Sequence, residues 1–449
     1  MSHRPTRRHA AAAITAVAAL TLTACAGPSV AGADGAGTAG DEATAEAVDW
    51  SAVEPASEIT WWSNHPGQSQ AVEQELIDAF EAENPEISVN LVTAGANYDE
   101  VAQRFQAASQ TDDLPDLVIA SDVWWFRYHL NDQIMPLDDV LEHLDADAED
   151  FQPALYADYE YEDQHWAVPY ARSTPLFYYN KDLWKAAGLE DRGPKTWQEL
   201  QEWAPKLKAA AGADKSVFEM PDGSNYLDWY FQNMVWDFGG NYSKEWTPTF
   251  TDPKTVAAGQ FLQDFAKAGY VKFNKTPEAD FGAGLATCIV QSTGSLGGIT
   301  KAAKFSVGTA FLPGDGNCPT GGAGVGIPAN ISDDRKKNAL KFIEFLTNAQ
   351  NTVTFTQATG YMPVRKSAVE LPEEKAYLEK NPNAKTAIEQ LPKTRSQDYV
   401  RVLLPGGGAR IGKGLDQIVQ GQDVATVFKA LDAESQQVFD SQIKSKLGA

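Results

Sequence analysis

Cysteine, histidine and basic side chains are scarce in this chain of 449 residues. Three cysteines are too few for the disulfide framework that holds small secreted domains together. Six histidines are scattered along the sequence, and none stands at the spacing of metal ligands. Lys and Arg number 37 against 61 Asp and Glu, a net charge of −24, whereas binding of nucleic acid requires a basic surface. We therefore expect no metal site and no nucleic-acid partner.

The motifs of the common enzyme classes are also absent. No GxSxG, HExxH or complete phosphate-loop motif occurs, and no GxGxxG stands between a predicted strand and a predicted helix. Gly406–Gly408 is not preceded by the strand that a phosphate loop needs, so we predict a flexible loop there. We expect that the protein is not an enzyme and holds no cofactor.

The N-terminal residues have the pattern of a secretion signal. Three arginines within residues 4–8 precede an apolar run that ends at Cys25 and is too short to span a membrane as a helix. Leu22–Cys25 reads Leu-Thr-Ala-Cys, which resembles the bacterial lipobox. We predict a signal peptide over residues 1–24 and a lipidated Cys25 that anchors the protein to the outer face of the cell membrane. Ordinary cleavage with an incidental Cys25 is the alternative.

Small and polar residues fill the stretch from position 26 to 58, and almost none of them can contribute to a core. We predict that residues 25–58 form the lipid anchor and a flexible linker, and that the folded part begins near Ile59. No later apolar run is long enough to span a membrane.

Two cysteines, Cys288 and Cys318, remain beyond the predicted anchor. An even number of thiols outside the cytoplasm favours oxidation, so we predict one disulfide between them. Two free buried thiols are the alternative.

Apolar periodicity predicts alternating strands and helices at the start of the folded part. Strands are expected over 58–62, 87–92 and 117–120, with helices over 70–83 and 98–108 between them. This order is typical of an α/β lobe with a mainly parallel sheet. Further strands are expected at Val168 and over 176–179, and further helices over 196–210, 255–268 and 334–347. Ligands of such sheets bind beyond the carboxyl ends of the strands, so we expect a site near the loops after Trp62, Val92 and Ala120.

Tryptophan and tyrosine are abundant, with 12 and 15 copies. Several recur near predicted strand ends or between elements, namely Trp61, Trp62, Trp124, Trp125, Trp229 and Trp236. Flat rings in a cleft can stack on sugars or surround a quaternary ammonium group. Packing in a core or between lobes is the alternative use of these side chains.

Two stretches are similar to the extracellular solute-binding proteins of ABC importers. The first reads TPLFYYNKDLWKAAGL over 174–189 with PKTWQEL at 194–200, and the second reads TGYMPVRKSA over 359–368. Within this family the sequence most resembles the Ugp-type binders of glycerol-3-phosphate and glycerophosphodiesters. The motifs that carry this closer resemblance are STPLFYYNKD at 173–182, SxGSL at 292–296 and EKNPNAKTA at 379–387.

The resemblance implies a set of ligand-binding residues. The matching positions are Tyr98, Asp122, Ser173, Ser292, Gly322, Tyr361 and Arg410, with Asp122 in place of a glutamate. The family's pair of tryptophans falls in a stretch that holds Tyr226, Trp229 and Trp236. In this set Arg410 would supply the charge for a phosphate, and Asp122 would accept the hydroxyl groups of a glycerol. A surface arginine in a loop is the alternative for Arg410.

The resemblance also implies a fold and a function. The fold is α/β, a two-lobed periplasmic-binding-protein fold of type II, like that of maltose-binding protein, with hinge strands and a central cleft. We expect residues 59–169 plus 325–360 in lobe 1 and residues 170–324 plus 361–449 in lobe 2. The implied function is capture of glycerol-3-phosphate or a glycerophosphodiester, such as glycerophosphocholine, by a monomeric lipoprotein that delivers it to the transmembrane permease subunits of an ABC importer. The alternative is a sugar- or oligosaccharide-binding protein of a carbohydrate importer.

Overall fold

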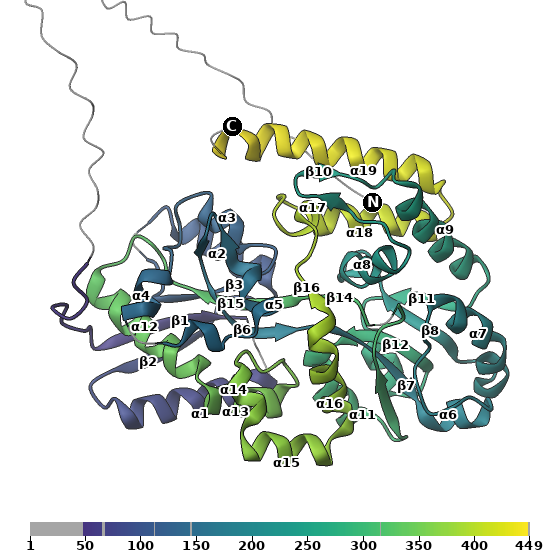
Figure 1. Cartoon of the computed structure of the whole chain (residues 1–449), viewed down its shortest axis with the longest axis horizontal. Helices are drawn as coiled ribbons and strands as arrows, with labels where there is room; N and C mark the ends of the chain where they lie inside the picture. Colours follow the sequence, from purple (N-terminus) through teal and green to yellow (C-terminus); the bar gives the residue numbers. More distant parts are fainter. Residues whose placement is uncertain (1–47, 65–67, 112, 144–145, 315, 448–449) are drawn as a thin grey trace, which may run out of the picture. The chain divides into compact units, whose positions relative to one another are not determined.

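The computed structural model describes residues 48–64, 68–111, 113–143, 146–314 and 316–447. The predicted signal peptide, Cys25 and most of the predicted linker therefore lie outside the described residues. Asp49–Ala449 forms one compact unit, which contains two five-stranded sheets (Figure 1).

The first sheet holds the strands that were expected at the start of the folded part. Its order is β2 (Ser88–Thr93), β1 (Glu58–Ser63), β3 (Leu117–Ser121), β15 (Gly321–Gly326) and β6 (Val168–Ser173). β1 runs parallel to β2 and β3, whereas β15 runs antiparallel to β3 and β6. β3 is buried along its whole length, as expected for a strand covered on both faces of a sheet. We call this sheet and the helices packed on it lobe 1.

The second sheet is built from the middle of the chain. Its order is β11 (Val271–Asn274), β8 (Ser216–Pro221), β12 (Ala286–Ser292), β7 (Pro175–Asn180) and β13 (Val307–Ala310). β8 pairs in parallel with β11 and β12, and β7 pairs antiparallel with β12 and β13. Phe177 and Phe218 are fully buried in its core. We call this sheet and the helices packed on it lobe 2.

Three two-stranded ladders accompany the large sheets. They are β4 (Glu160–Tyr161) with β5 (Gln164–His165), β9 (Ser243–Lys244) with β10 (Thr247–Pro248), and β14 (Cys318–Pro319) with β16 (Thr394–Arg395). β14 and β16 pair in parallel, which brings the chain just before β15 beside the start of residues 394–447, which we call the C-terminal segment.

Helices cover the sheets and make up most of the last hundred residues (Figure 1). The longer ones are α1 (Gln68–Glu83), α2 (Tyr98–Ala108), α7 (Trp197–Ala211), α8 (Leu227–Asp237), α9 (Pro253–Lys267), α12 (Asp333–Thr347), α13 (Ala349–Thr359), α15 (Pro372–Lys380), α16 (Pro382–Gln390), α18 (Gly407–Val419) and α19 (Val424–Val438). The shorter ones are α3 (Trp125–His129), α4 (Asp138–His143), α5 (Pro153–Tyr156), α6 (Lys181–Ala186), α10 (Pro277–Gly282), α11 (Leu296–Ala302), α14 (Lys366–Glu370) and α17 (Tyr399–Val402). Two single turns, η5 (Phe439–Ile443) and η6 (Lys444–Lys446), extend α19.

Helix starts follow the capping chemistry of the sequence. The Asn97 side chain accepts a hydrogen bond from the backbone of Glu100 and so begins α2, and Thr196 does the same for α7 through Glu199.

α2 spans the predicted residues, and the other predicted strands and helices lie close to their expected bounds. The prediction of an α/β pattern for this part of the chain is confirmed.

The prediction of a flexible loop at Gly406–Gly408 is wrong. Gly406 precedes α18, and Gly407 and Gly408 are its first residues. A Cβ atom on Gly407 would lie 2.2 Å from the carbonyl oxygen of Val400, so this glycine permits close packing of α18 against α17.

The prediction of a Cys288–Cys318 disulfide is also wrong, because both cysteines are free and buried. The Cys288 thiol lies in β12 and donates to the carbonyl oxygen of Val217 at 3.3 Å. The Cys318 sulfur lies in β14, 3.3 Å from Oγ1 of Thr394. Burial raises the pKa of Cys318 to about 12 and raises that of Cys288 as well, so neither thiol forms the thiolate that oxidation requires.

The chain passes from lobe 1 to lobe 2 within a single residue. β6 ends at Ser173 in the first sheet, and β7 begins at Pro175 in the second. It returns to the first sheet at Gly321, where β15 begins. The sheets therefore change at Thr174 and near Thr320, a few residues from the predicted boundaries, and the full assignment of residues to lobes stays a prediction.

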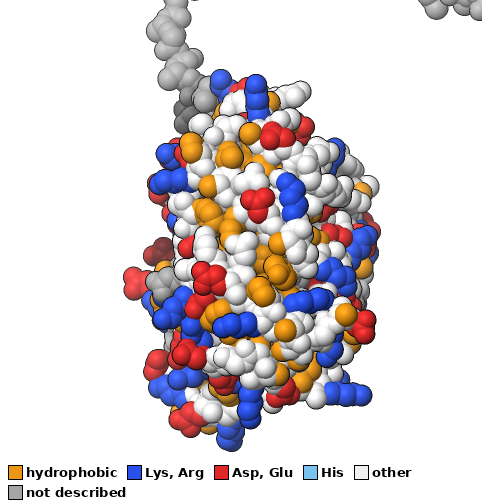
Figure 2. Space-filling model, turned by 90° about the vertical axis from the view of Figure 1, so that its right-hand side faces the viewer, with side chains coloured by type: hydrophobic (Ala, Val, Ile, Leu, Met, Phe, Trp, Pro, Cys, Tyr) orange, Lys and Arg blue, Asp and Glu red, His pale blue; other side chains and the backbone are white. Residues whose placement is uncertain are grey.

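Three further observations concern the helices, the candidate metal ligands and the surface. No helix among the described residues is long and apolar enough to cross a membrane. Within the same residues, no three His, Cys, Asp or Glu side chains are grouped so that they could hold a metal ion. On the face shown in Figure 2, acidic and basic side chains are interspersed around apolar patches.

Candidate ligand-binding site

A cavity of about 260 Å³ lies where the two lobes meet. Its wall combines residues that follow strands of both sheets with residues from α8 and α17. The lining residues are Tyr98, Asp122, Ser173, Asn225, Tyr226, Trp229, Tyr230, Glu278, Gln291, Ser292, Ser295, Gly321, Gly322, Tyr361 and Arg401. Eight of the ten predicted ligand-binding residues are among them, and Trp236 and Arg410 are not.

Lobe 1 contributes Tyr98 and Asp122. Tyr98 is the first residue of α2, directly after the Asn97 cap. Asp122 follows β3, and its backbone N–H donates to the carbonyl oxygen of Gly322 at 3.0 Å. Asp122 therefore stands at the carboxyl end of a buried strand, where the topology of an open sheet favours ligands.

The strands that join the lobes contribute Ser173 and Gly322. These residues lie on neighbouring strands, since Ser173 ends β6 and pairs with Gly321 of β15. Gly322 has φ +94°, and a Cβ atom there would lie 2.2 Å from the carbonyl oxygen of Ala171. Position 322 thus requires glycine for both its backbone conformation and its packing.

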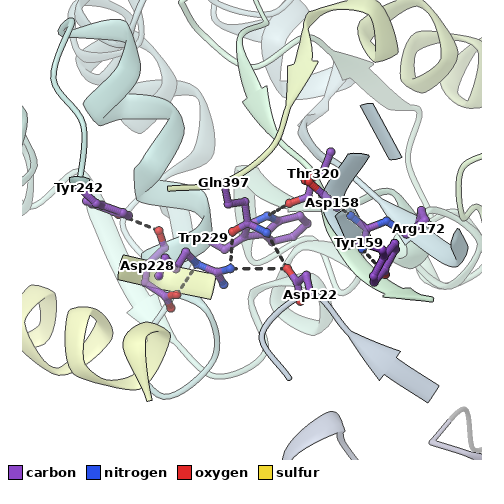
Figure 3. Close-up of polar contacts among 10 residues, drawn as sticks. Asp122, Asp158, Tyr159, Arg172, Asp228, Trp229, Tyr242, Thr320 and Gln397 are labelled. Atoms are coloured by element: carbon purple, nitrogen blue, oxygen red, sulfur yellow. Dashed lines mark hydrogen bonds and ion pairs between the residues drawn. The ribbon is translucent and has the colours of Figure 1, made fainter. Parts of the chain in front are cut away.

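Lobe 2 contributes Ser292 at the end of β12 and the start of α8. The Ser292 hydroxyl accepts a hydrogen bond from the backbone of Gly294 at 3.2 Å. Trp229 is buried, and its Nε1 donates to the carbonyl oxygen of Thr320 at 2.7 Å, which fixes the indole ring (Figure 3). Tyr226 precedes α8 with φ +69°, and 40% of its surface is exposed.

Tyr361 lies beside Tyr98 in the wall of the cavity. It follows Gly360, whose φ of +90° ends α13, and its ring stacks on Phe355 with 5.7 Å between the ring centroids. Burial raises the pKa of both Tyr98 and Tyr361. Both hydroxyl groups therefore stay protonated at neutral pH and can donate hydrogen bonds.

The basic residue of the cavity wall is Arg401, in α17. Its Nε lies 2.6 Å from Oδ2 of Asp228, and its Nη1 lies 3.6 Å from Oδ2 of Asp122. Burial opposes the charged form, but the two carboxylates outweigh it and raise the pKa of Arg401 above its usual value. Arg401 is 2% exposed and permanently charged.

Gln397 connects this arginine to lobe 1. Its Nε2 donates to Oδ2 of Asp122 at 2.6 Å, and its Oε1 accepts from Nη1 of Arg401. These residues form one network with Arg401 and Asp228. Figure 3 shows Asp122, Gln397 and Asp228 of this network, with Trp229 next to it. Asp122 of lobe 1 is thus held by two side chains of the C-terminal segment.

Arg410 lies away from the cavity wall, on α18. Its Nη2 donates to the carbonyl oxygen of Pro405 at 2.8 Å, and burial lowers its pKa. Trp236 also lies away from the wall, near the C-terminal end of α8, where the guanidinium of Arg395 stands 3.7 Å from the ring centroid. The structure therefore brings Arg401, and not Arg410, together with the other predicted residues.

Sequence reasoning missed seven lining residues. They are Asn225, Tyr230, Glu278, Gln291, Ser295, Gly321 and Arg401. Several of them are direct neighbours in sequence of predicted residues, and their positions could have been inferred from those. Arg401 and Glu278 carry no such indication, because each reaches the cavity from a short helix remote from the predicted motifs.

The cavity wall offers mainly neutral donors. The hydroxyl groups of Tyr98, Ser173, Ser292, Ser295 and Tyr361 accompany one guanidinium. Asp122 and Glu278 are the carboxyl groups of the wall, and Gln291 Nε2 donates to Glu278 at 2.7 Å while burial raises the pKa of Glu278. A small ligand with one anionic group and several hydroxyl groups would match this arrangement.

A second cavity of about 470 Å³ adjoins the first. Asn225, Tyr226 and Arg401 line both. The second cavity also carries Trp124, whose Nε1 donates to Asp99 at 2.6 Å. The half-exposed Tyr226 therefore stands between the two cavities.

Comparison with known proteins assigns the chain to a family. The model of the family described as "Bacterial extracellular solute-binding protein" matches residues 75–386. The sn-glycerol-3-phosphate-binding periplasmic protein UgpB of Escherichia coli (strain K12) is 29% identical over 354 residues, which cover 74% of this chain and 80% of that protein. The protein of the same name from Shigella dysenteriae serotype 1 (strain Sd197) has the same identity and coverage.

Solved structures agree with this assignment. UgpB from Mycobacterium tuberculosis, crystallised in complex with glycerophosphocholine, is 47% identical with a TM-score of 0.83, and the match covers 86% of this chain and 100% of that one. The sugar-binding protein MalE of Xanthomonas citri, at 20% identity and a TM-score of 0.73, covers 86% of this chain and 98% of its own and shares the fold. The predicted maltose-binding-protein-like fold and the predicted Ugp-type resemblance are confirmed. The chain belongs to the bacterial extracellular solute-binding protein family.

Proposed function

We propose that this protein captures glycerol-3-phosphate or a glycerophosphodiester, such as glycerophosphocholine, for uptake by an ABC importer. The observation that carries the proposal is the cavity whose wall contains the buried Arg401 together with a group of hydroxyl donors. The relatives support the proposal. UgpB of Escherichia coli is named as a glycerol-3-phosphate-binding protein, and UgpB of Mycobacterium tuberculosis was crystallised with glycerophosphocholine.

The wall suggests how such a ligand is held. Arg401 and the hydroxyl groups of Ser292 and Tyr361 would bind the phosphate oxygens, because charged and neutral donors together satisfy an anion out of water. Asp122 would accept hydroxyl groups of the glycerol. Gly322 lets the backbone approach the ligand closely, since it carries no side chain.

Capture would proceed by closure of the two lobes about the strands that join them. The ligand contacts Asp122 of lobe 1 and Arg401 of the C-terminal segment, so it bridges the parts that move. A ligand that interacts with both lobes favours the closed state by its differential affinity for that state. The permease would then receive the closed, loaded protein.

The N-terminal prediction becomes part of this proposal. Lipidation of Cys25 and removal of residues 1–24 would keep the protein at the outer face of the cell membrane. Two or more acyl chains on one cysteine suffice for stable anchoring. We propose that the protein works there as a monomer.

The proposal is tested by titration calorimetry of the protein from residue 26 onward. The ligands are glycerol-3-phosphate, glycerophosphocholine and maltose. Binding of either phosphate ester without binding of maltose is the expected result. Binding of maltose alone would favour the sugar-binding alternative, which the same aromatic rings and carboxyl groups could serve.

A further inference from the structure

The C-terminal end of the chain crosses from lobe 2 to lobe 1 outside the ligand cavity. α19 packs on α9 and α18 of lobe 2 and continues through η5 and η6. The Nζ of Lys446 in η6 donates to the carbonyl oxygen of Leu130 at 3.1 Å and to Oδ1 of Asn131 at 2.7 Å. Leu130 and Asn131 follow α3, which comes directly after β3 of the first sheet. In Figure 1 the C-terminal end of α19 extends toward α3.

An aromatic contact accompanies this polar one. Trp246, in the turn between β9 and β10, packs on Phe439 of η5 with 5.4 Å between the ring centroids. The same indole lies 5.7 Å from the ring of Phe126 in α3 and 5.1 Å from that of Tyr399. The rings of lobe 2 and of the C-terminal end therefore meet a ring of lobe 1.

These contacts are separate from ligand recognition. The lining of the two cavities does not include Lys446, Asn131, Trp246 or Phe126. Their free energy is gained whenever the lobes are together, whether or not a ligand is bound. In a two-state equilibrium such a contribution raises the population of the binding-competent state, and the apparent dissociation constant falls in proportion.

We propose that Phe439–Lys446 and Trp246 form a latch that holds the lobes together and strengthens the binding of every ligand by the same factor. Ligand selectivity then depends on the cavity wall, whereas overall affinity and residence time depend on the latch. The latch can be tested by ligand binding and by the distance between the lobes in the free protein. The second measurement uses no ligand, so the latch can be tested apart from the proposed ligand class.

The first test compares two lysines of one turn. Lys446→Met keeps the aliphatic stem and removes the donor, and Lys444→Met is the matched control, because Lys444 is also exposed and no hydrogen bond or ion pair of it is found in the described structure. We expect Lys446→Met to weaken the binding of glycerol-3-phosphate and of glycerophosphocholine by the same factor, about two- to fivefold, through faster dissociation. Trp246→Leu is expected to weaken both by about tenfold. The control should bind like the wild type.

The second test needs no ligand. Spin labels on Glu83→Cys in α1 and Lys206→Cys in α7, both at exposed positions, report the distance between the lobes. The latch variants should shift the distance distribution of the free protein to longer values, and the Lys444→Met control should not. Unchanged distances in Lys446→Met and Trp246→Leu overturn the latch, and so does an affinity change confined to one ligand. If neither phosphate ester binds the wild type, the proposed function fails while the distances still decide on the latch.

Discussion

Nε of Arg401 and Oδ2 of Asp228 lie 2.6 Å apart in a site where both side chains are almost fully buried. The pair orients the guanidinium, and Nη1 contacts both Oε1 of Gln397 and Oδ2 of Asp122. An arginine held in this way presents its third nitrogen, Nη2, at a fixed position, and a charged N–H donor is a strong partner for a phosphate oxygen. We therefore propose Arg401, rather than Arg410, as the arginine that binds the phosphate group of the ligand.

Replacement of Arg401 by lysine should weaken the binding of glycerophosphocholine by about tenfold, because an ammonium group keeps the charge but cannot contact Asp228, Gln397 and a phosphate at once as a guanidinium can, and ~1.4 kcal/mol of lost interaction is tenfold. Arg410→Lys is the control and should leave the affinity close to that of the wild type. Titration calorimetry on both variants, with thermal melts to verify folding, measures the effect. The opposite order of the two variants would support the assignment of the phosphate to Arg410.

Removal of the Asp228 carboxylate should destabilise the protein as well as the site. Asp228→Ala leaves the Arg401 charge buried beside fewer partners, and breaking such a pair costs about 3–5 kcal/mol. Glu389→Ala is the control, since Glu389 pairs with Lys385 at 3.2 Å on the surface and an exposed pair contributes ~0–1 kcal/mol. Urea unfolding measures both losses. Equal losses in the two variants would contradict the role of the buried pair.

The resemblance to the solute-binding family predicted Tyr98 and Asp122 as site residues. The apolar pattern predicted only the elements beside them, a helix over 98–108 and a strand over 117–120. Arg401 could not be placed, because α17 has four residues and reaches Asp122 only through the packing of the C-terminal segment. The glycines at 406–408 suggested a loop, whereas their missing side chains serve the contact between α17 and α18.

The cysteines show the same limit. An even number of thiols says nothing about which strands carry them, and the structure places Cys288 in the second sheet and Cys318 in a separate ladder. Whether the two cysteines meet depends on which strands pair with each other, and this pairing joins residues that are far apart in the sequence.

The protein from residue 26 onward should contain two free thiols. Under native conditions at pH 8 both should react slowly with a thiol reagent, because burial raises the pKa of Cys318 to about 12 and raises that of Cys288 as well, and a thiol without thiolate is inert. After denaturation without reductant, two thiols per chain should react at once. A count of zero after denaturation would show that the pair is oxidised in solution.

Glu73 of α1 should make the stability of the protein depend on pH. Its carboxyl group is fully buried, and the Ser63 hydroxyl donates to its two oxygens at 3.0 and 3.1 Å. Burial raises the pKa of Glu73 from 4.5 to about 8, although the hydrogen bond from Ser63 opposes the shift. The nearby Tyr170 and Tyr361 stay neutral over this range, because burial raises the pKa of each.

The direction of the effect follows from proton binding. Between pH 4.5 and about 8 the folded protein keeps a proton on Glu73 that the unfolded chain releases, so the contribution of this group is fully present below pH 4.5 and is lost as the pH rises through about 8. The slope is at most ~1.4 kcal/mol per pH unit. Glu73→Gln removes the titrating group and keeps a side chain of similar size. Urea unfolding of both proteins at pH 5, 6, 7 and 8 should therefore show a free energy of unfolding that falls more steeply with pH in the wild type than in the variant. Parallel curves for the two proteins would mean that Glu73 does not hold its proton in the folded state.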